Sequence, residues 1–237
     1  YNLDKSIPEQ FLIYLQNAIT GDFGDSMTRK GTAVTTIIAR CLPATMKLGL
    51  VAFIIAITVG VTLGIVAAFT KRKWVENLVM FVATIGISVP SFLYAMLLMI
   101  VFGVILGWLP IIGLKTPLHY IMPAFSLALY PISMITRLVR SSMKEVMKQD
   151  YIVLARSKGT PMIKVILGHA LKNCLIPVVT YAGPLLAFLI TGSFVIESLF
   201  SIPGIGSEFV NSVTNRDYTM IMALTILFGS FIIIVNI

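Results

Sequence analysis

The sequence predicts an all-α protein that crosses a membrane several times. Of its 237 residues, 57% are hydrophobic and only 12% are charged, whereas soluble domains carry about 25% charged residues. A water-soluble enzyme has no core large enough for so much apolar side chain, and a disordered chain has too little of it. Backbone groups inside a bilayer must bond within their own segment, so the spans are expected to be helices of about 20 residues.

Five stretches are apolar over a length that suits a span. They are residues 48–70, 77–106, 121–136, 175–196 and 218–237. The second would measure about 45 Å as a straight helix at about 1.5 Å per residue. Because Pro90 removes a helical hydrogen bond, we expect this stretch to bend there.

Both ends of the chain indicate a fragment. It starts at Tyr1 without a methionine and stops at Ile237 within an apolar run. We therefore expect five spans of a total of six and a truncated C-terminus. Residues 1–33 are then an extracellular segment that follows a missing first span.

Basic residues orient the chain. Three lie in 71–73 and eight in 137–172, against one each in 107–120 and 197–217. The positive-inside rule places 71–73 and 137–172 in the cytoplasm, so the five spans alternate from there. Cys41 and Cys174 fall on opposite faces, which excludes a disulfide between them. The two histidines are separated in the same way, and nothing has the spacing of a metal site.

The middle of each predicted span lacks Asp, Glu, Lys, Arg and His. Proton- and ion-coupled transporters usually need such groups there, so the driving energy is expected from outside the spans. Small polar and aromatic residues are the candidates for an uncharged pathway or gate, and their alternative role is helix packing or a simple turn. These candidates are Ser88, Pro90, Ser91, Tyr94, Tyr130, Tyr181, Pro203 and Gly204.

Residues 148–172 predict two short helices that project into the cytoplasm. The first covers 151–157, and Gly159 suits the left-handed position after a helix. Thr160 suits the N-cap and Pro161 the first position of the second helix. The apolar and basic residues of this amphipathic segment suit docking in a groove of another protein. The alternative is a helix that lies on lipid headgroups.

Several motifs then suggest a family. The text LARSKG followed by HALKNCLIPV resembles the EAA loop of binding-protein-dependent ABC transporter permeases in its dipeptide, oligopeptide and nickel form. Against the general consensus, the chain keeps Ala155, Gly159 and Leu171. It departs from that consensus at Val153, Leu154, His169 and Lys172. Further similar motifs follow the family's order: GDFGDS, TTIIARCLPAT, SVPSF, GWLP, LVRSSMKEVMKQDYI and TGSFVIESLFSIPGIGSEF.

The resemblance implies a type I ABC importer transmembrane domain over 34–237, in a multi-pass protein of the bacterial cytoplasmic membrane. Its implied partners are a homologous second permease subunit, two cytoplasmic ABC ATPases, an extracellular or periplasmic peptide-binding protein, a peptide substrate and membrane lipid, with no nucleic acid. The chain has no phosphate-loop motif, so it is expected to hold no cofactor and to catalyse nothing, while the ATPases use ATP and Mg. The residues implied in ATPase coupling are Asp150, Ala155, Arg156, Lys158, Gly159, Pro161 and His169.

The resemblance leaves two alternatives to an oligopeptide importer. A dipeptide or nickel-chelate importer has nearly the same permease motifs. An uncoupled channel or membrane scaffold would share the uncharged spans, but it would not need a capped pair of cytoplasmic helices.

Overall fold

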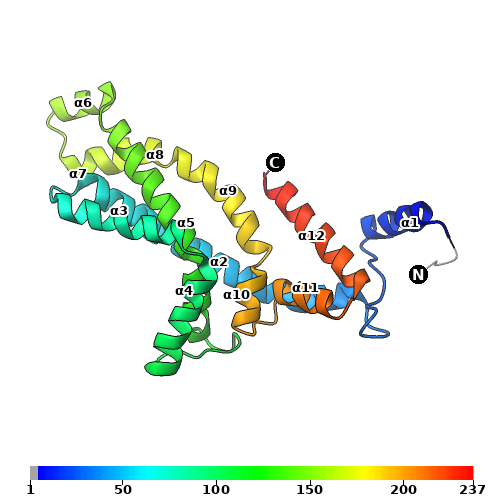
Figure 1. The fold of residues 1–237 in the computed structure, drawn as a ribbon. Helices are drawn as coiled ribbons and strands as arrows, with labels where there is room; N and C mark the ends of the chain where they lie inside the picture. The colour runs from blue at the N-terminus through cyan, green and yellow to red at the C-terminus, as the bar shows by residue number, and fades with distance from the viewer. Residues whose placement is uncertain (1–4, 237) are drawn as a thin grey trace.

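The computed structural model describes residues 5–236, so the ends of the predicted segments 1–33 and 218–237 lie outside the described residues. Twelve α-helices and two π-helices, η1 and η2, form the regular structure of the described part (Figure 1). Their bounds are α1 (Ile7–Ile19), α2 (Val34–Phe69), α3 (Lys73–Ser88), α4 (Ser91–Leu98), η1 (Met99–Ile105), α5 (Leu118–Val146), α6 (Asp150–Ser157), α7 (Met162–Val165), η2 (Ile166–Ala170), α8 (Leu171–Cys174), α9 (Ile176–Ile190), α10 (Phe194–Leu199), α11 (Ile205–Thr214) and α12 (Tyr218–Asn236).

The helices provide up to five candidate spans, as the sequence predicts. Four are long and apolar enough by themselves: α2, α5, Ile176–Leu199 and α12. The fifth is a broken pair, in which α3 meets α4 and η1 at 105°. Pro90 lies in the break, so the expected bend is confirmed, and it is far sharper than a kink within one helix.

Two spans are much longer than predicted. Helix α2 begins at Val34 rather than 48 and has 36 residues, about 54 Å against an apolar bilayer thickness of about 30 Å. Its first turns bury Val34 and Ile37 against the start of α12, in a cluster with Met220 and Leu224. Helix α5 continues through the basic residues to Val146 rather than ending at 136. Hydropathy alone does not detect such extensions, because they lie beyond the apolar run.

Small residues let α2 lie close against α5. Ala56, Gly60 and Gly64 are buried at four-residue spacing along α2. A Cβ on Gly60 would lie only 2.8 Å from the Cβ of Ile135. Lipid tails are as apolar as the side chains of a spanning helix, so burial of apolar surface does not drive two helices together inside a bilayer. They associate instead through close packing of small residues such as these. This pair of helices forms the centre of the main apolar core.

The positions of the two cysteines and of the basic segments agree with the predicted assignment of loops to two opposite sides. Cys41 and Cys174 are both buried and free, in two different apolar clusters. The carboxylate of Glu76 in α3 pairs with Arg140 and Lys144 at the end of α5. The basic segments 71–73 and 137–172 therefore meet at one end of the molecule, where α6 and α7 project (Figure 1). That this end faces the cytoplasm stays a prediction.

Candidate functional site

The loop after α5 contains the predicted joint at Gly159. This residue has φ +77°, the left-handed conformation expected at that position. Its amide donates to the carbonyl of Arg156 at 2.9 Å, and the amide of Thr160 donates to that of Ala155 at 3.3 Å. These two bonds form a Schellman motif, which satisfies carbonyls that the end of α6 would otherwise leave unpaired. The predicted helix stop is confirmed.

The second short helix begins one residue later than predicted. Pro161 has extended backbone (ψ 139°) and acts as the N-cap of α7, which starts at Met162. The carbonyl of Pro161 accepts from the amides of Lys164 and Val165. The assignments of Thr160 as N-cap and Pro161 as first helical residue were therefore wrong by one position, because the extended turn includes the proline. Helix α6 likewise begins at Asp150, one residue early.

The loop has an inner face and an outer face. Ile152 is fully buried in the main core with Val165, and Ala155 is half-buried against the same core. The outward side carries large exposed apolar side chains. We call this set the loop surface, and its members are Val153, Leu154, Met162, Ile163 and Leu167.

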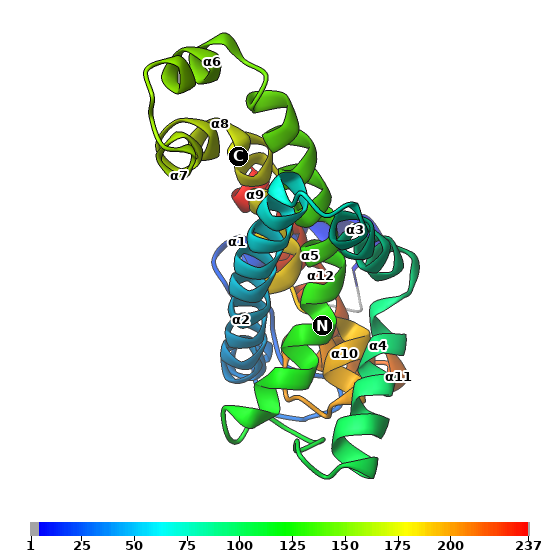
Figure 2. The same cartoon turned by 90° about the vertical axis from the view of Figure 1, so that its left-hand side faces the viewer.

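Basic residues accompany the loop surface. Arg156, Lys158 and Lys164 are all exposed on the same projecting segment, seen at the upper end of Figure 2. Of the five residues of the loop surface, the sequence singled out only Val153 and Leu154, as departures from the family consensus, and it did not predict which way they face. Counted from buried Ile152 at about 100° per residue, the helical period places Leu154 on the opposite side of α6 and Ala155 back toward the buried side.

The remaining predicted coupling residues are exposed but lie in separate turns. Asp150 opens α6, where its charge suits the helix N-terminus, and Pro161 precedes α7. His169 lies on η2, beyond α7. The structure therefore brings the predicted residues into one projecting loop without gathering their side chains into a single cluster.

The predicted pathway residues fall into two groups. The first flanks the break at Pro90: the Ser88 hydroxyl donates to the carbonyl of Thr84 at 2.9 Å, and the Tyr94 hydroxyl donates to that of Ile85 at 2.7 Å. Ser91 is the first residue of α4. The Ser88 bond lies within the last turn of α3, whereas the Tyr94 bond runs from α4 back to α3 and holds the two arms of the broken span together.

The second group is a pair of phenols. Tyr130 of α5 is exposed, and Tyr181 of α9 packs against the main core. The helices that carry them contact each other. This pair is separate from the break in α3–α4, so the six predicted pathway positions form two sites.

The predicted gate segment, 201–206, is a packed turn. Pro203 is exposed, but Gly204 is buried beneath it. A Cβ on Gly204 would overlap both the Glu197 carboxylate and the Thr45 hydroxyl. The backbone of this turn therefore lies directly against polar side chains of α10 and α2.

Glu197 was expected beside the gate segment in an outer loop, but the sequence did not predict that it is buried and caps a helix. Its Oε2 accepts from the amides of Gly206 at 2.8 Å and Ser207 at 3.1 Å. Thr45 Oγ1 donates to Glu197 Oε1 at 2.9 Å and accepts from the Ile205 amide at 2.9 Å. These contacts cap the N-terminus of α11, where unpaired amides favour a carboxylate. The sequence placed Glu197 in an outer loop, yet it is fully buried.

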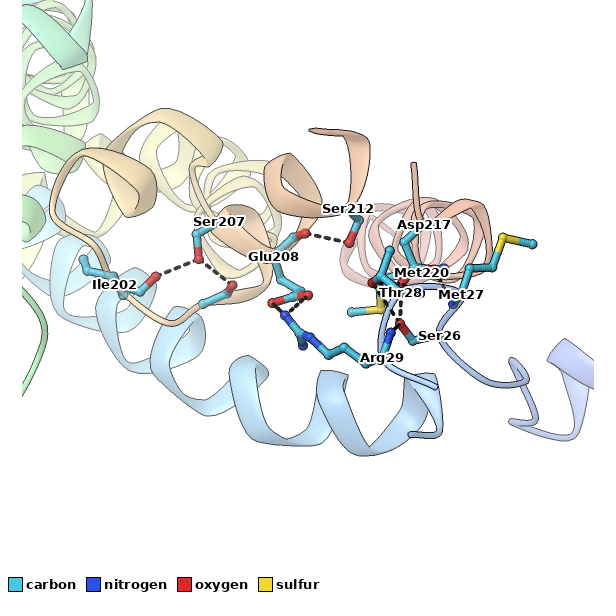
Figure 3. A network of polar contacts seen from close by, with 11 residues as sticks. Ser26, Met27, Thr28, Arg29, Ile202, Ser207, Glu208, Ser212, Asp217 and Met220 are labelled. Atoms are coloured by element: carbon cyan, nitrogen blue, oxygen red, sulfur yellow. Dashed lines mark hydrogen bonds and ion pairs between the residues drawn. The ribbon is translucent and has the colours of Figure 1, made fainter. Parts of the chain in front are cut away.

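A second polar network joins the N-terminal segment to α11 and α12 (Figure 3). Asp217 accepts from the hydroxyls of Ser26 and Thr28 and from the amide of Met27 at 3.1 Å. Arg29 pairs with Glu208 of α11 at 2.8 Å. Burial alone would raise the pKa of Asp217, but these hydrogen bonds outweigh it and hold the pKa below its ordinary value. We call residues 26–29 with Glu208 and Asp217 the N-terminal clasp.

Comparison with known proteins agrees with this architecture. The family model described as "Binding-protein-dependent transport system inner membrane component" matches residues 60–237. The chain is 41% identical to the oligopeptide transport system permease protein OppB of Haemophilus influenzae, covering 100% of this chain and 78% of that protein. It is 42% identical to the dipeptide transport system permease protein DppB of Bacillus subtilis, covering 99% of this chain and 76% of that protein.

Solved structures share the fold at low sequence identity. An inward-facing form of the MetNI methionine ABC transporter superposes with a TM-score of 0.67 at 18% identity, covering 84% of this chain and 93% of that one. An amino acid ABC transporter solved with histidines gives 0.65 at 14% identity, covering 85% and 90%. Together with the match over most of its length, these findings show that the chain belongs to the family of binding-protein-dependent transport system inner membrane components.

Proposed function

We propose that this chain is the permease subunit through which an ATP-driven importer takes up oligopeptides. The observation that carries the proposal is the similarity over nearly the whole chain to permeases named for oligopeptide and dipeptide transport. Members of the family are membrane components without catalytic activity of their own. Energy then has to enter from partner ATPase subunits that bind ATP and Mg.

The loop surface is the proposed contact for those ATPases. It presents five large apolar side chains next to Arg156, Lys158 and Lys164, a composition that suits a groove on another protein. Buried Ile152 and Val165 fix the loop to the core formed by α5 and α9. Movement of a docked ATPase would therefore be transmitted to the spans rather than absorbed by a loose loop.

The translocation step is proposed as alternating access. Partner contacts that differ between two states would shift which side the pathway opens to. The break at Pro90 and the phenols Tyr130 and Tyr181 are the proposed uncharged lining. The remaining half of the pathway would come from a homologous second permease subunit, with a peptide-binding protein delivering substrate on the outer side.

A dipeptide importer is the second candidate, because relatives from Bacillus subtilis and Lactococcus lactis carry that name. Uptake assays in cells that lack their own peptide permeases distinguish the two. Cells that express the complete complex should accumulate a labelled pentapeptide, and an unlabelled pentapeptide should compete better than a dipeptide. Uptake of dipeptide alone would select the second candidate. Uptake of a nickel chelate but of neither peptide would contradict both.

A further inference from the structure

Helix α2, at the start of its apolar run, and the segment around the start of α5 line an open cavity that the proposed transport function does not use. It has a volume of about 630 Å³ and opens to the surface. Its lining combines two lysines with an apolar wall. The residues are Lys47, Leu50, Val51, Leu114, Lys115, Thr116, Pro117 and Tyr120. Helix α2 and the start of α5 lie side by side at this place (Figure 2).

The cavity lies at the level where the spans begin. Lys47 directly precedes the long apolar run of α2, and Lys115 lies three residues before the first residue of α5. Gly49, two residues after Lys47, lies against the carbonyl of Leu189 in the last turn of α9. The start of the apolar run of α2, the first turn of α5 and the last turn of α9 thus lie near one another here. Both lysines then lie at a membrane–water boundary, with Leu50, Val51 and Tyr120 on the side of the apolar interior.

The charge of the cavity is uncompensated. Among residues 5–236, the ion pairs are those of Arg29, Arg140 and Lys144, so neither Lys47 nor Lys115 has a carboxylate partner. Neither Asp nor Glu lines the cavity. Two unpaired ammonium groups above an apolar wall complement a molecule with an anionic head and a hydrocarbon body.

We propose that this cavity binds an anionic phospholipid from the outer leaflet. The lysines contact the headgroup phosphate, while Leu50, Val51 and Tyr120 contact the upper part of an acyl chain. A phospholipid is favoured over a free peptide because five of the eight lining residues are apolar or aromatic and the cavity opens beside two spans. The proposal concerns the lipid-facing boundary and does not depend on which substrate is transported.

Native mass spectrometry of the purified complex tests the site, with phosphatidylglycerol or phosphatidylcholine added. The test variant replaces both lysines, Lys47→Gln with Lys115→Gln. The matched control is Lys5→Gln with Lys30→Gln, which removes the same charge from exposed positions outside the cavity. A basic residue near an anionic surface contributes roughly fivefold in affinity. The test variant should therefore bind phosphatidylglycerol about thirtyfold more weakly, and the control should bind it like the wild type.

A third variant checks the apolar wall. Leu50→Asn should weaken binding of both lipids, because it alters the acyl contact and leaves the charge in place. Equal retention of phosphatidylglycerol by the wild type and the double-lysine variant would overturn the proposal. A second result would also overturn the proposal: the double-lysine variant keeps its bound lipid, but acidic peptides no longer compete for uptake by it. The cavity would then be a contact for the transported substrate.

Discussion

Substitution of Gly159 should uncouple transport without preventing folding. The residue adopts φ +77°, and a left-handed backbone costs a residue with a Cβ about 1–2 kcal/mol. That cost corresponds to a roughly five- to thirtyfold change in the population of the joint that orients α6, at about 1.4 kcal/mol per factor of ten. A Cβ at this position would meet nothing within 4 Å. The effect therefore comes from backbone conformation and not from a clash.

A series of substitutions separates conformation from side-chain size. Gly159→Val should be the most damaging, because β-branched residues are the least tolerant of positive φ. Gly159→Asn should retain most function, because asparagine visits the left-handed region more readily. The matched control is Gly168→Ala in η2, where the glycine is also exposed and a Cβ also meets open space, but φ is not positive.

The assays are membrane insertion, co-purification of the ATPase subunits and peptide uptake in cells. Gly159→Val should accumulate in the membrane at near-normal levels while uptake and ATPase association fall together. Gly168→Ala and Gly159→Asn should keep both. If Gly159→Val transported peptide as well as the Gly168→Ala control, the capped joint would have no role in coupling, and a helix lying on the membrane surface would explain the loop better.

Four further changes test other parts of the structure. Leu154→Asp places a charge on the loop surface and should abolish ATPase co-purification with little change in the amount of protein in the membrane. The reason is that an unpaired charge buried in an interface costs several kcal/mol. Ala155 is a poorer position for this test because its side chain packs against the core. Gly204→Ala should lower the free energy of unfolding by about 1–3 kcal/mol, because the added methyl group overpacks against Glu197 and Thr45. The control Gly229→Ala adds a methyl group in open space and should not lower it. Equal thermal midpoints of unfolding for the two variants would contradict the packed turn. Asp217 has a lowered pKa, so its stabilising contribution is fully present above the unfolded-state pKa and is lost as pH falls through the folded-state pKa. Asp217→Asn should be less stable at neutral pH and lose less stability on acidification, and parallel curves of thermal midpoint against pH would refute this. Lys158→Cys in a cysteine-free background should react with an impermeant thiol reagent only from the cytoplasmic side, and labelling of intact cells from outside would reverse the orientation.

The sequence predicted the elements whose signal is local. Apolar runs located the five candidate spans, Pro90 located the break in the second, and Gly159 located the end of α6. Each depends on a property of one short segment: hydropathy, a missing amide or a permitted backbone angle. For that reason these predictions did not require knowledge of the tertiary contacts between helices.

Features that depend on distant partners were missed. The sequence alone suggests that Glu197 is a loop carboxylate, because its hydrogen-bond donors on Gly206, Ser207 and Thr45 come close to it only in the folded protein. The sequence alone suggests that the start of α2 belongs to an extracellular tail, whereas in the structure α11 and α12 pack against it. The outward direction of Leu154 and the inward direction of Ala155 likewise follow from burial of Ile152. The N-terminal clasp joins residues some 190 positions apart, which no sequence window covers.

The central claim is that this permease moves peptide only when partner ATPases drive it through the loop at 148–172. Peptide uptake into proteoliposomes that contain the complete purified complex tests this most directly, with ATP or a non-hydrolysable analogue supplied on the ATPase side. The account predicts accumulation of peptide above the external concentration with ATP and none with the analogue, and it predicts loss of the ATP-dependent uptake in the Leu154→Asp complex. Equilibration of peptide across the membrane without ATP, unchanged by Leu154→Asp, would instead show an uncoupled channel and contradict the account.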